Sequence, residues 1–174
     1  MVNTNNPLGF NESAWNDLED GEKEKVTKIH DWDFSFLTGD QLLRHGVCER
    51  CIHDDATNEL KRFFAVKVLR DIHPMGCFSQ VVAEAWHAFI LDTQRYEEFC
   101  SVVYGKTIHH IPTNYGKGVM DNSVWMSVYR EWFGDFPRVW KLDKEGKEIP
   151  GYEHAMNIEG NIVSSDMDSD DGAF

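Results

Sequence analysis

The sequence predicts a mainly α protein: an orthogonal bundle of about four helices, with an irregular N-terminal segment and a disordered acidic C-terminal tail. Apolar residues recur at helical spacing in separate stretches, each bounded by a capping residue, a Gly or a Pro. No strand–helix unit is evident. The length of 174 residues and the 41% hydrophobic content suit one domain with a core that needs no disulfides.

The first helix is predicted over residues 55–71, where Leu60 and Phe64 share one apolar face. A second helix is predicted over residues 80–91, with Ser79 as its N-cap. Both helices present an apolar stripe, so both should pack against the rest of the bundle.

The third helix is predicted over residues 93–104. Asp92 or Thr93 would cap its N-terminus, and Gly105 suits the left-handed position after its C-terminus. Because the connection at residues 92–93 is so short, the second and third helices should be neighbours.

The fourth helix is predicted over residues 123–133, with Asp121 or Ser123 as its cap and Gly134 as its stop. The large aromatic residues on the inward faces of the last three helices should be largely buried. These are Trp86, Phe89, Tyr96, Phe99, Trp125 and Trp132.

Four regions are predicted along the chain. Residues 1–30 form an acidic, partly ordered N-terminal segment, and residues 31–140 form the helical core domain. Residues 141–163 form an extended arm or a short hairpin. Residues 164–174 are rich in Asp and poor in apolar side chains, so they are expected to be a disordered acidic tail.

The formal net charge of −13 disfavours a surface for nucleic acid or anionic lipid, because phosphate binding relies on Lys and Arg. No apolar run approaches the roughly 20 residues that cross a bilayer. Residues 1–6 are polar and lack the features of a secretory signal, so a cytoplasmic location is predicted. The acidity itself favours solubility, or docking on a protein partner with a basic surface.

An ordered set of residues in the middle of the chain has a familiar pattern. It consists of Trp86-His87, Tyr96, Cys100, Gly105 and His109-His110 before Pro112. Over roughly residues 63–140 this set resembles the glycine-rich-domain-containing-protein-like family of bacteria and plants. The usual acidic residue of that family's Val-Asp-x-x-Trp-His pattern is replaced here by Ala83. The resemblance implies a helical fold and a shared His/Cys constellation, and it implies no particular activity.

The same residues suggest a metal site. His87 lies on the second predicted helix and Cys100 on the third, while His109 and His110 follow the third and could fold back over the pair. Imidazole nitrogen and thiolate are preferred zinc ligands. The alternatives are a structural histidine bonded to a carbonyl, a cysteine that serves as a small apolar residue, and acid–base chemistry at the histidines.

A Cys-x-x-Cys pair, Cys48 and Cys51, is flanked by His45 and His53. Such a pair is half of a structural zinc site, and it could be completed by these histidines or join His87 or His109 across the bundle. A redox pair and plain structural thiols are the alternatives. Disulfides are not expected, because the sequence shows no secretory signal.

The sequence contains no phosphate-binding loop, nucleophile elbow or dinucleotide fingerprint, which argues against an enzyme. The predicted function is a small acidic binding module, zinc-stabilised or plain, that acts through a protein partner. One alternative is a metal-dependent enzyme that uses His87 and His109 with an open coordination position. The other is an acidic inhibitor or accessory protein that docks on a basic nucleic-acid-handling protein.

Overall fold

The computed structural model describes residues 6–37, 50–73, 75–77, 79–110, 122–143 and 145–150, with no side-chain description for residues 50–53. In the described chain the regular secondary structure is helical, apart from an isolated antiparallel bridge between Leu142 and Glu148. The predicted mainly α bundle is confirmed. Its elements are η1 (Pro7–Gly9), α1 (Glu12–Asp17), α2 (Asp20–Asp31), α4 (Arg50–Arg70), α5 (Gln80–Leu91), α6 (Thr93–Val103), α7 (Ser123–Phe133) and η2 (Arg138–Lys141).

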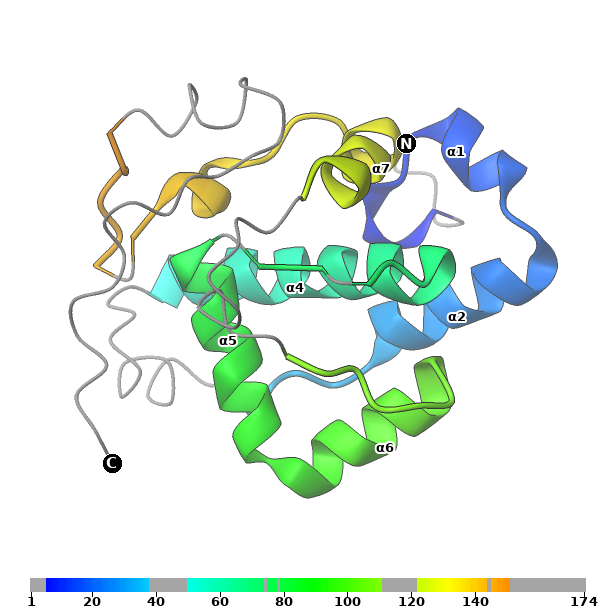
Figure 1. Cartoon of the computed structure of the whole chain (residues 1–174), viewed down its shortest axis with the longest axis horizontal. Helices are drawn as coiled ribbons and strands as arrows, with labels where there is room; N and C mark the ends of the chain where they lie inside the picture. The colour runs from blue at the N-terminus through cyan, green and yellow to red at the C-terminus, as the bar shows by residue number, and fades with distance from the viewer. Residues whose placement is uncertain are drawn as a thin grey trace.

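The 21-residue helix α4 lies at the centre of the bundle, with α5 running across it and α2 and α7 packed on other sides (Figure 1). Its apolar stripe is fully buried, as Leu60, Phe63 and Phe64 show no exposed surface. Each such side chain contributes roughly 1.5–3 kcal/mol by leaving water. The helix begins earlier in the structure than the apolar pattern predicts, at Arg50 instead of residue 55.

Capping side chains set the connection between α5 and α6. The Ser79 hydroxyl oxygen accepts a hydrogen bond from Val82 N at 3.2 Å, and the Asp92 carboxylate accepts one from Arg95 N at 3.3 Å. At the far end of α6, Gly105 has φ 78°, and its N–H donates to Cys100 O at 3.0 Å. The caps and the left-handed glycine are therefore as predicted, and α5 and α6 are adjacent.

Helix α7 begins differently from the prediction. Its N-cap residue is Asn122, whose side chain makes no capping hydrogen bond. The Asn122 amide oxygen instead accepts hydrogen bonds from Gly76 N at 3.1 Å and from Trp125 Nε1 at 2.9 Å. Asn122 thus ties α7 to the segment before α5, a long-range role that no local capping rule predicts.

The predicted aromatic core is confirmed, with exposures between 0% and 6%. The residues concerned are Trp86, Phe89, Tyr96, Phe99, Trp125 and Trp132.

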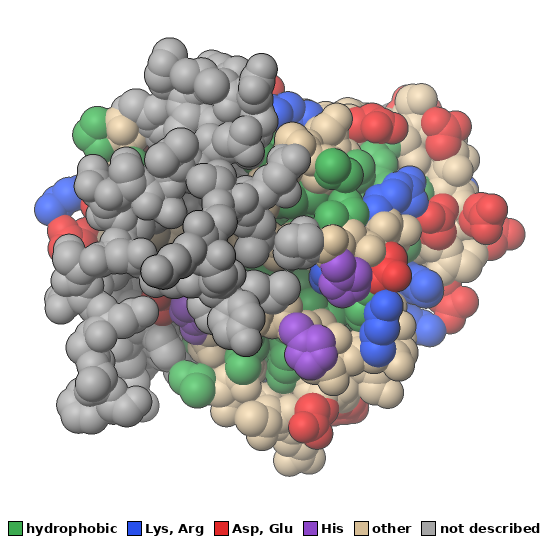
Figure 2. Space-filling view, in the orientation of Figure 1, with side chains coloured by type: hydrophobic (Ala, Val, Ile, Leu, Met, Phe, Trp, Pro, Cys, Tyr) green, Lys and Arg blue, Asp and Glu red, His purple; other side chains and the backbone are tan. Residues whose placement is uncertain are grey.

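The N-terminal helices pack onto this core. Helix α2 starts with a capping box, in which Glu19 N donates to Glu22 Oε2 at 3.0 Å. Val26 and Ile29 on α2 are fully buried, and the helix lies against α4. Acidic side chains gather on the outer edge that α1 and α2 form (Figure 2).

A buried carboxylate joins three of the helical elements. Glu59 on α4 is 3% exposed and accepts hydrogen bonds from the Tyr129 hydroxyl and from Trp140 Nε1, the latter at 2.7 Å. Its other oxygen accepts from Arg62 Nη1 at 2.8 Å. Arg62 in turn donates to Leu8 O at 2.8 Å, so the network extends to η1. A buried carboxylate needs several such donors to offset its lost hydration.

The predicted arm is described over residues 141–143 and 145–150, which pair with each other as in a short hairpin. Asp143 N donates to Lys147 O and Ile149 N donates to Lys141 O, both at 2.9 Å, around a turn at Gly146 with φ 80°. The remainder of the arm and the predicted acidic tail lie outside the described residues. Within the described chain, no helix is long and apolar enough to cross a membrane.

Candidate functional site

Two of the predicted site histidines meet on the surface of the bundle. His87 comes from α5, and His110 comes from the segment that follows α6. Their Nε2 atoms are 3.1 Å apart, and the rings stand at 75° to each other with centroids 4.6 Å apart. The sequence placed both residues in one site, and the structure brings these two together.

Buried aromatic residues hold His110 in this position. The ring edge of Trp86 faces His110 with centroids 4.7 Å apart. Trp86 Nε1 donates to the Tyr96 hydroxyl at 3.0 Å, and that hydroxyl donates to the backbone oxygen of Ile108. The chain from residue 108 to residue 110 is therefore fixed against α5 and α6, and His110 is oriented before any ligand arrives.

An acidic side chain stands behind His87. The Glu84 carboxylate, one helical turn earlier on α5, lies 3.6 Å from His87 Nδ1. A carboxylate at this nitrogen favours the tautomer that carries the proton on Nδ1 and leaves Nε2 as an acceptor. Position 83, where the resembled family has an acidic residue, is Ala here. Glu84, the next residue of α5, supplies a carboxylate near His87 instead.

The environment keeps His110 uncharged. Burial lowers the pKa of His110 to about 4, and the neighbouring His87 ring acts in the same direction, against the opposing influence of Glu84. At neutral pH the His110 ring is therefore an uncharged imidazole with one lone pair.

The remaining predicted ligands are placed differently. Cys100 is 2% exposed and contacts the Tyr96 hydroxyl and the Ile108 backbone. Burial raises the pKa of the Cys100 thiol, so the thiol is protonated at neutral pH. Cys100 is a free cysteine, and so is Cys77. His109 is exposed, beside His110 in the chain.

The structure does not describe the side chains of the Cys-x-x-Cys pair. Cys48 lies outside the described residues, and Cys51 is described only as part of the α4 backbone. Among the side chains that the structure does describe, no group of three or more His, Cys, Asp or Glu residues is arranged to hold a metal ion. The two imidazoles are thus a donor pair.

Two nitrogens 3.1 Å apart can do one of two things. They can share a single proton in an N–H···N hydrogen bond. They can also bind one metal ion: two nitrogens at about 2.0–2.1 Å from a tetrahedral zinc stand about 3.3 Å apart. The observed separation lies within hydrogen-bonding range and is slightly shorter than the separation of two nitrogens on zinc.

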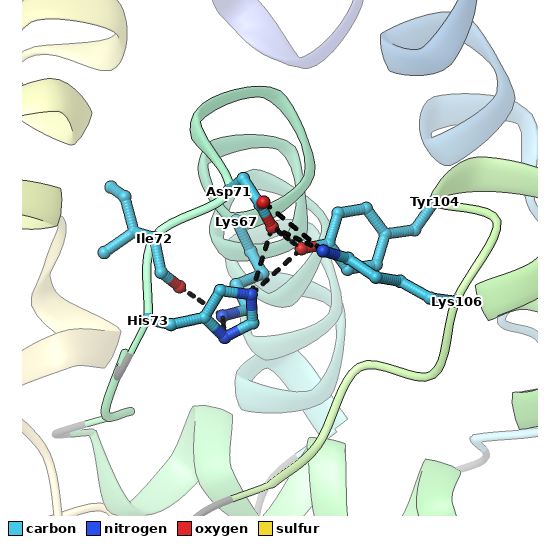
Figure 3. Close-up of polar contacts among 6 residues, drawn as sticks. All are labelled: Lys67, Asp71, Ile72, His73, Tyr104 and Lys106. Atoms are coloured by element: carbon cyan, nitrogen blue, oxygen red, sulfur yellow. Dashed lines mark hydrogen bonds and ion pairs between the residues drawn. The ribbon is translucent and has the colours of Figure 1, made fainter.

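A second polar cluster, not foreseen from the sequence, lies where α4 ends (Figure 3). Lys67 Nζ on α4 contacts His73 Nδ1 at 2.9 Å and donates to the backbone oxygen of Ile72. His73 Nε2 lies 3.0 Å from Asp71 Oδ1, which also accepts from the Tyr104 hydroxyl and, at 3.0 Å, from Lys106 Nζ. Lys67 is only 3% exposed.

One signal in the sequence could have found this cluster. Lys67 falls three residues after Phe64 and one before Val68, inside the apolar stripe of α4, where a lysine must find a polar partner. Tyr104 and Lys106, which donate to Asp71, come from beyond α6, and that distant contact is not readable from spacing.

The fold and the paired histidines define a small all-helical protein with a preformed imidazole donor pair. A family model described as UCP032817-like matches residues 24–132, which span α2 to α7. The chain belongs to the UCP032817-like family. No curated protein and no solved structure matches the chain. Both polar clusters lie within the matched residues.

Proposed function

We propose that the protein is a small acidic helical binding module whose working site is the His87–His110 pair. The pair binds a transition-metal ion, zinc in the first place, and the module acts through a protein partner. The observation that carries the proposal is the 3.1 Å separation of the two Nε2 atoms, each on a ring that the fold holds in place.

The chemistry of the pair supports a metal. Both donors are imidazole nitrogens, which suit zinc, copper and nickel better than calcium or magnesium. His110 is uncharged at neutral pH, so a shift of its one ring proton from Nε2 to Nδ1 frees the Nε2 lone pair for a metal. Glu84 lies at the far nitrogen of His87, where a carboxylate orients a ligating histidine.

The donor count supports an open site. Two imidazoles fill two of the four positions of tetrahedral zinc. Water, or a side chain of the partner, would fill the others, so the metal could bridge the module to its partner. Cys48 and Cys51 are proposed completing ligands on residue type alone, and exchange of both for Ser tests them.

The charge of the chain supports a basic partner. The net charge is −13, and acidic side chains cover the edge formed by α1 and α2 (Figure 2). If this charge drives docking, affinity for the partner should fall steeply between low and high salt. Salt-independent binding would instead assign recognition to the metal-bearing face.

The resemblance to the glycine-rich-domain-containing-protein-like family is a further part of the proposal. It is supported by the packing of the residues that carry it: Trp86 bonds to Tyr96, and His87 faces His110. This kinship would extend the binding-site hypothesis to that family, and it adds no activity.

Titration of zinc into the metal-free protein by calorimetry tests the site. The protein is prepared without a histidine tag. His87→Ala and His110→Ala should each abolish the binding seen with the wild type. His109→Ala is the matched control, because His109 is the exposed neighbour of His110 and should leave binding unchanged. Equal zinc binding by the wild type and both pair variants would refute the proposal and leave a structural hydrogen bond.

A further inference from the structure

The cluster around Lys67 has the order of an acid–base relay. Lys67 Nζ contacts His73 Nδ1 at 2.9 Å, and His73 Nε2 contacts Asp71 Oδ1 at 3.0 Å. The three groups form a line, with the amine at one end and the carboxylate at the other (Figure 3). The amine occupies the position that a nucleophile holds in a nucleophile–base–acid triad.

The carboxylate end fixes the histidine tautomer. Lys106 lowers the pKa of Asp71 by hydrogen bonding, and His73 does so as well, so Asp71 is ionised and acts only as an acceptor. His73 Nε2 must then carry the proton that it donates to Asp71. His73 Nδ1 is left with its lone pair facing Lys67, which is the arrangement of a general base.

The lysine end is prepared for nucleophilic chemistry. Lys67 is 3% exposed, and burial lowers its pKa to about 8; Lys106 acts in the same direction and Asp71 opposes it. At pH 7.5 about a quarter of such an amine is neutral, against about 0.1% of an ordinary lysine. Roughly 200 times more of the reactive form is thus present.

The backbone contributes to the geometry. Asp71, just after α4, has φ 47°, a left-handed conformation that Asp adopts more readily than most residues. This turn brings Ile72 O and His73 back over α4 toward Lys67. A buried lysine that only terminated the helix would need the carbonyl of Ile72. It would not need a histidine whose second nitrogen is held by a carboxylate.

We propose that Lys67, His73 and Asp71 form a reactive-amine site at which Lys67 Nζ condenses with a small aldehyde or ketone to give an imine. This activity is separate from metal binding at the His87–His110 pair. Two of the three groups are about half exposed, His73 at 49% and Asp71 at 57%, so the relay reaches the surface beside a buried amine. The expected substrate is therefore a small carbonyl compound.

The step balances without a further reactant. The lone pair of Lys67 Nζ forms a bond to the carbonyl carbon while the carbonyl π electrons move to oxygen. His73 Nδ1 removes a proton from the nitrogen and passes it to the alkoxide oxygen, which gives the neutral carbinolamine, and Asp71 stabilises the imidazolium that forms in between. His73 Nδ1 then takes the second proton from the nitrogen and delivers it to the hydroxyl, which leaves as water as the C=N bond forms. The net change is the condensation of one amine and one carbonyl with release of one water.

Reductive trapping in the wild-type protein tests the site. The intact chain is treated with propanal and sodium cyanoborohydride at pH 7.5, and propylated lysines are mapped by peptide mass spectrometry over time. Lys28, 43% exposed on α2, is the internal control. Lys67 should be modified at least about tenfold faster than Lys28 despite its burial, with a rate that reaches half its maximum near pH 8. If exposure alone governed reactivity, the order would be reversed.

Variants separate the relay from burial. His73→Gln and Asp71→Asn should each slow Lys67 modification about tenfold or more and leave the Lys28 rate unchanged. His30→Gln is the matched control, since the His30 ring also contacts an aspartate, Asp31, at 2.8 Å, while Lys61 Nζ bonds only to the backbone oxygen of His30. Modification of Lys67 no faster than Lys28, or an unchanged Lys67 rate in His73→Gln, would overturn the proposal. If a variant fails to fold, the pH profile of the wild type decides: a midpoint above about 9.5 overturns it.

Discussion

Substitution of Glu59 by Gln tests how far a buried charge holds this bundle together. Glu59 is 3% exposed and accepts from Tyr129, from Trp140 Nε1 at 2.7 Å and from Arg62 Nη1 at 2.8 Å. The amide of Gln keeps the shape but offers one acceptor oxygen and one donor group. At least one of the donors would then face an N–H group, and Arg62 would lose its counter-charge.

The magnitude follows from these contacts. A hydrogen bond to a charged group contributes about 1.5–3 kcal/mol, and a buried donor left unsatisfied costs about 1–3 kcal/mol. Glu59→Gln should therefore lower the free energy of unfolding by about 3 kcal/mol. For a chain of this size that corresponds to a fall in Tm of roughly 6–12 °C. Replacing all members of the network by apolar side chains should restore part of the lost free energy of unfolding, because buried ion pairs carry a large desolvation penalty.

The assay is urea unfolding followed by tryptophan fluorescence, to which Trp140 contributes as one of six tryptophans. Glu24→Gln is the matched control: Glu24 pairs with Lys28 on the exposed face of α2, where such a pair contributes little to stability. The reasoning is refuted if Glu59→Gln and Glu24→Gln reduce stability by the same small amount.

Two further predictions concern the core and the histidine pair. Trp125→Ala should lower the free energy of unfolding by about 3–5 kcal/mol, because Trp125 is fully buried. The control Val124→Ala, at a neighbouring side chain that is 60% exposed, should lower it by under about 0.5 kcal/mol, and calorimetric melting of both variants tests the difference. The pKa of His110 is lowered to about 4, whereas the unfolded ring titrates near its ordinary value. The unfolded state therefore binds more protons between about pH 6.5 and 4, and stability should fall as pH drops through that window. Urea midpoints should show a smaller fall in His110→Gln than in His30→Gln, and equal falls would contradict this assignment.

Much of the fold is predictable because its signals are local. The α5 and α6 boundaries follow from Ser79, Asp92 and Gly105, residues whose capping and left-handed roles depend on their immediate neighbours. Helix α7 shows the limit of that approach. Asn122 holds Gly76 N, which is far away in the sequence, instead of capping its own helix.

Some features of the candidate site are likewise predictable from local sequence, and others are not. His87 and His110 could be expected to meet, because the short turn at Asp92 folds α6 back along α5. Cys100 could not be separated from them by pattern, since an inward position suits both a ligand and a buried thiol. In the structure its thiol contacts the Ile108 backbone, and that contact depends on the path of residues 104–108, which spacing does not predict.

The metal content of the protein, measured by elemental analysis after equilibration with zinc and removal of the excess, tests the central claim most directly. The wild type should retain near-stoichiometric metal, and His87→Ala and His110→Ala should retain none, because each leaves a single imidazole. Retention should weaken as pH falls, since protons compete for the imidazole nitrogens. Absence of zinc, iron, copper and nickel from the wild type would contradict the account, and the His87–His110 contact would then be a shared proton.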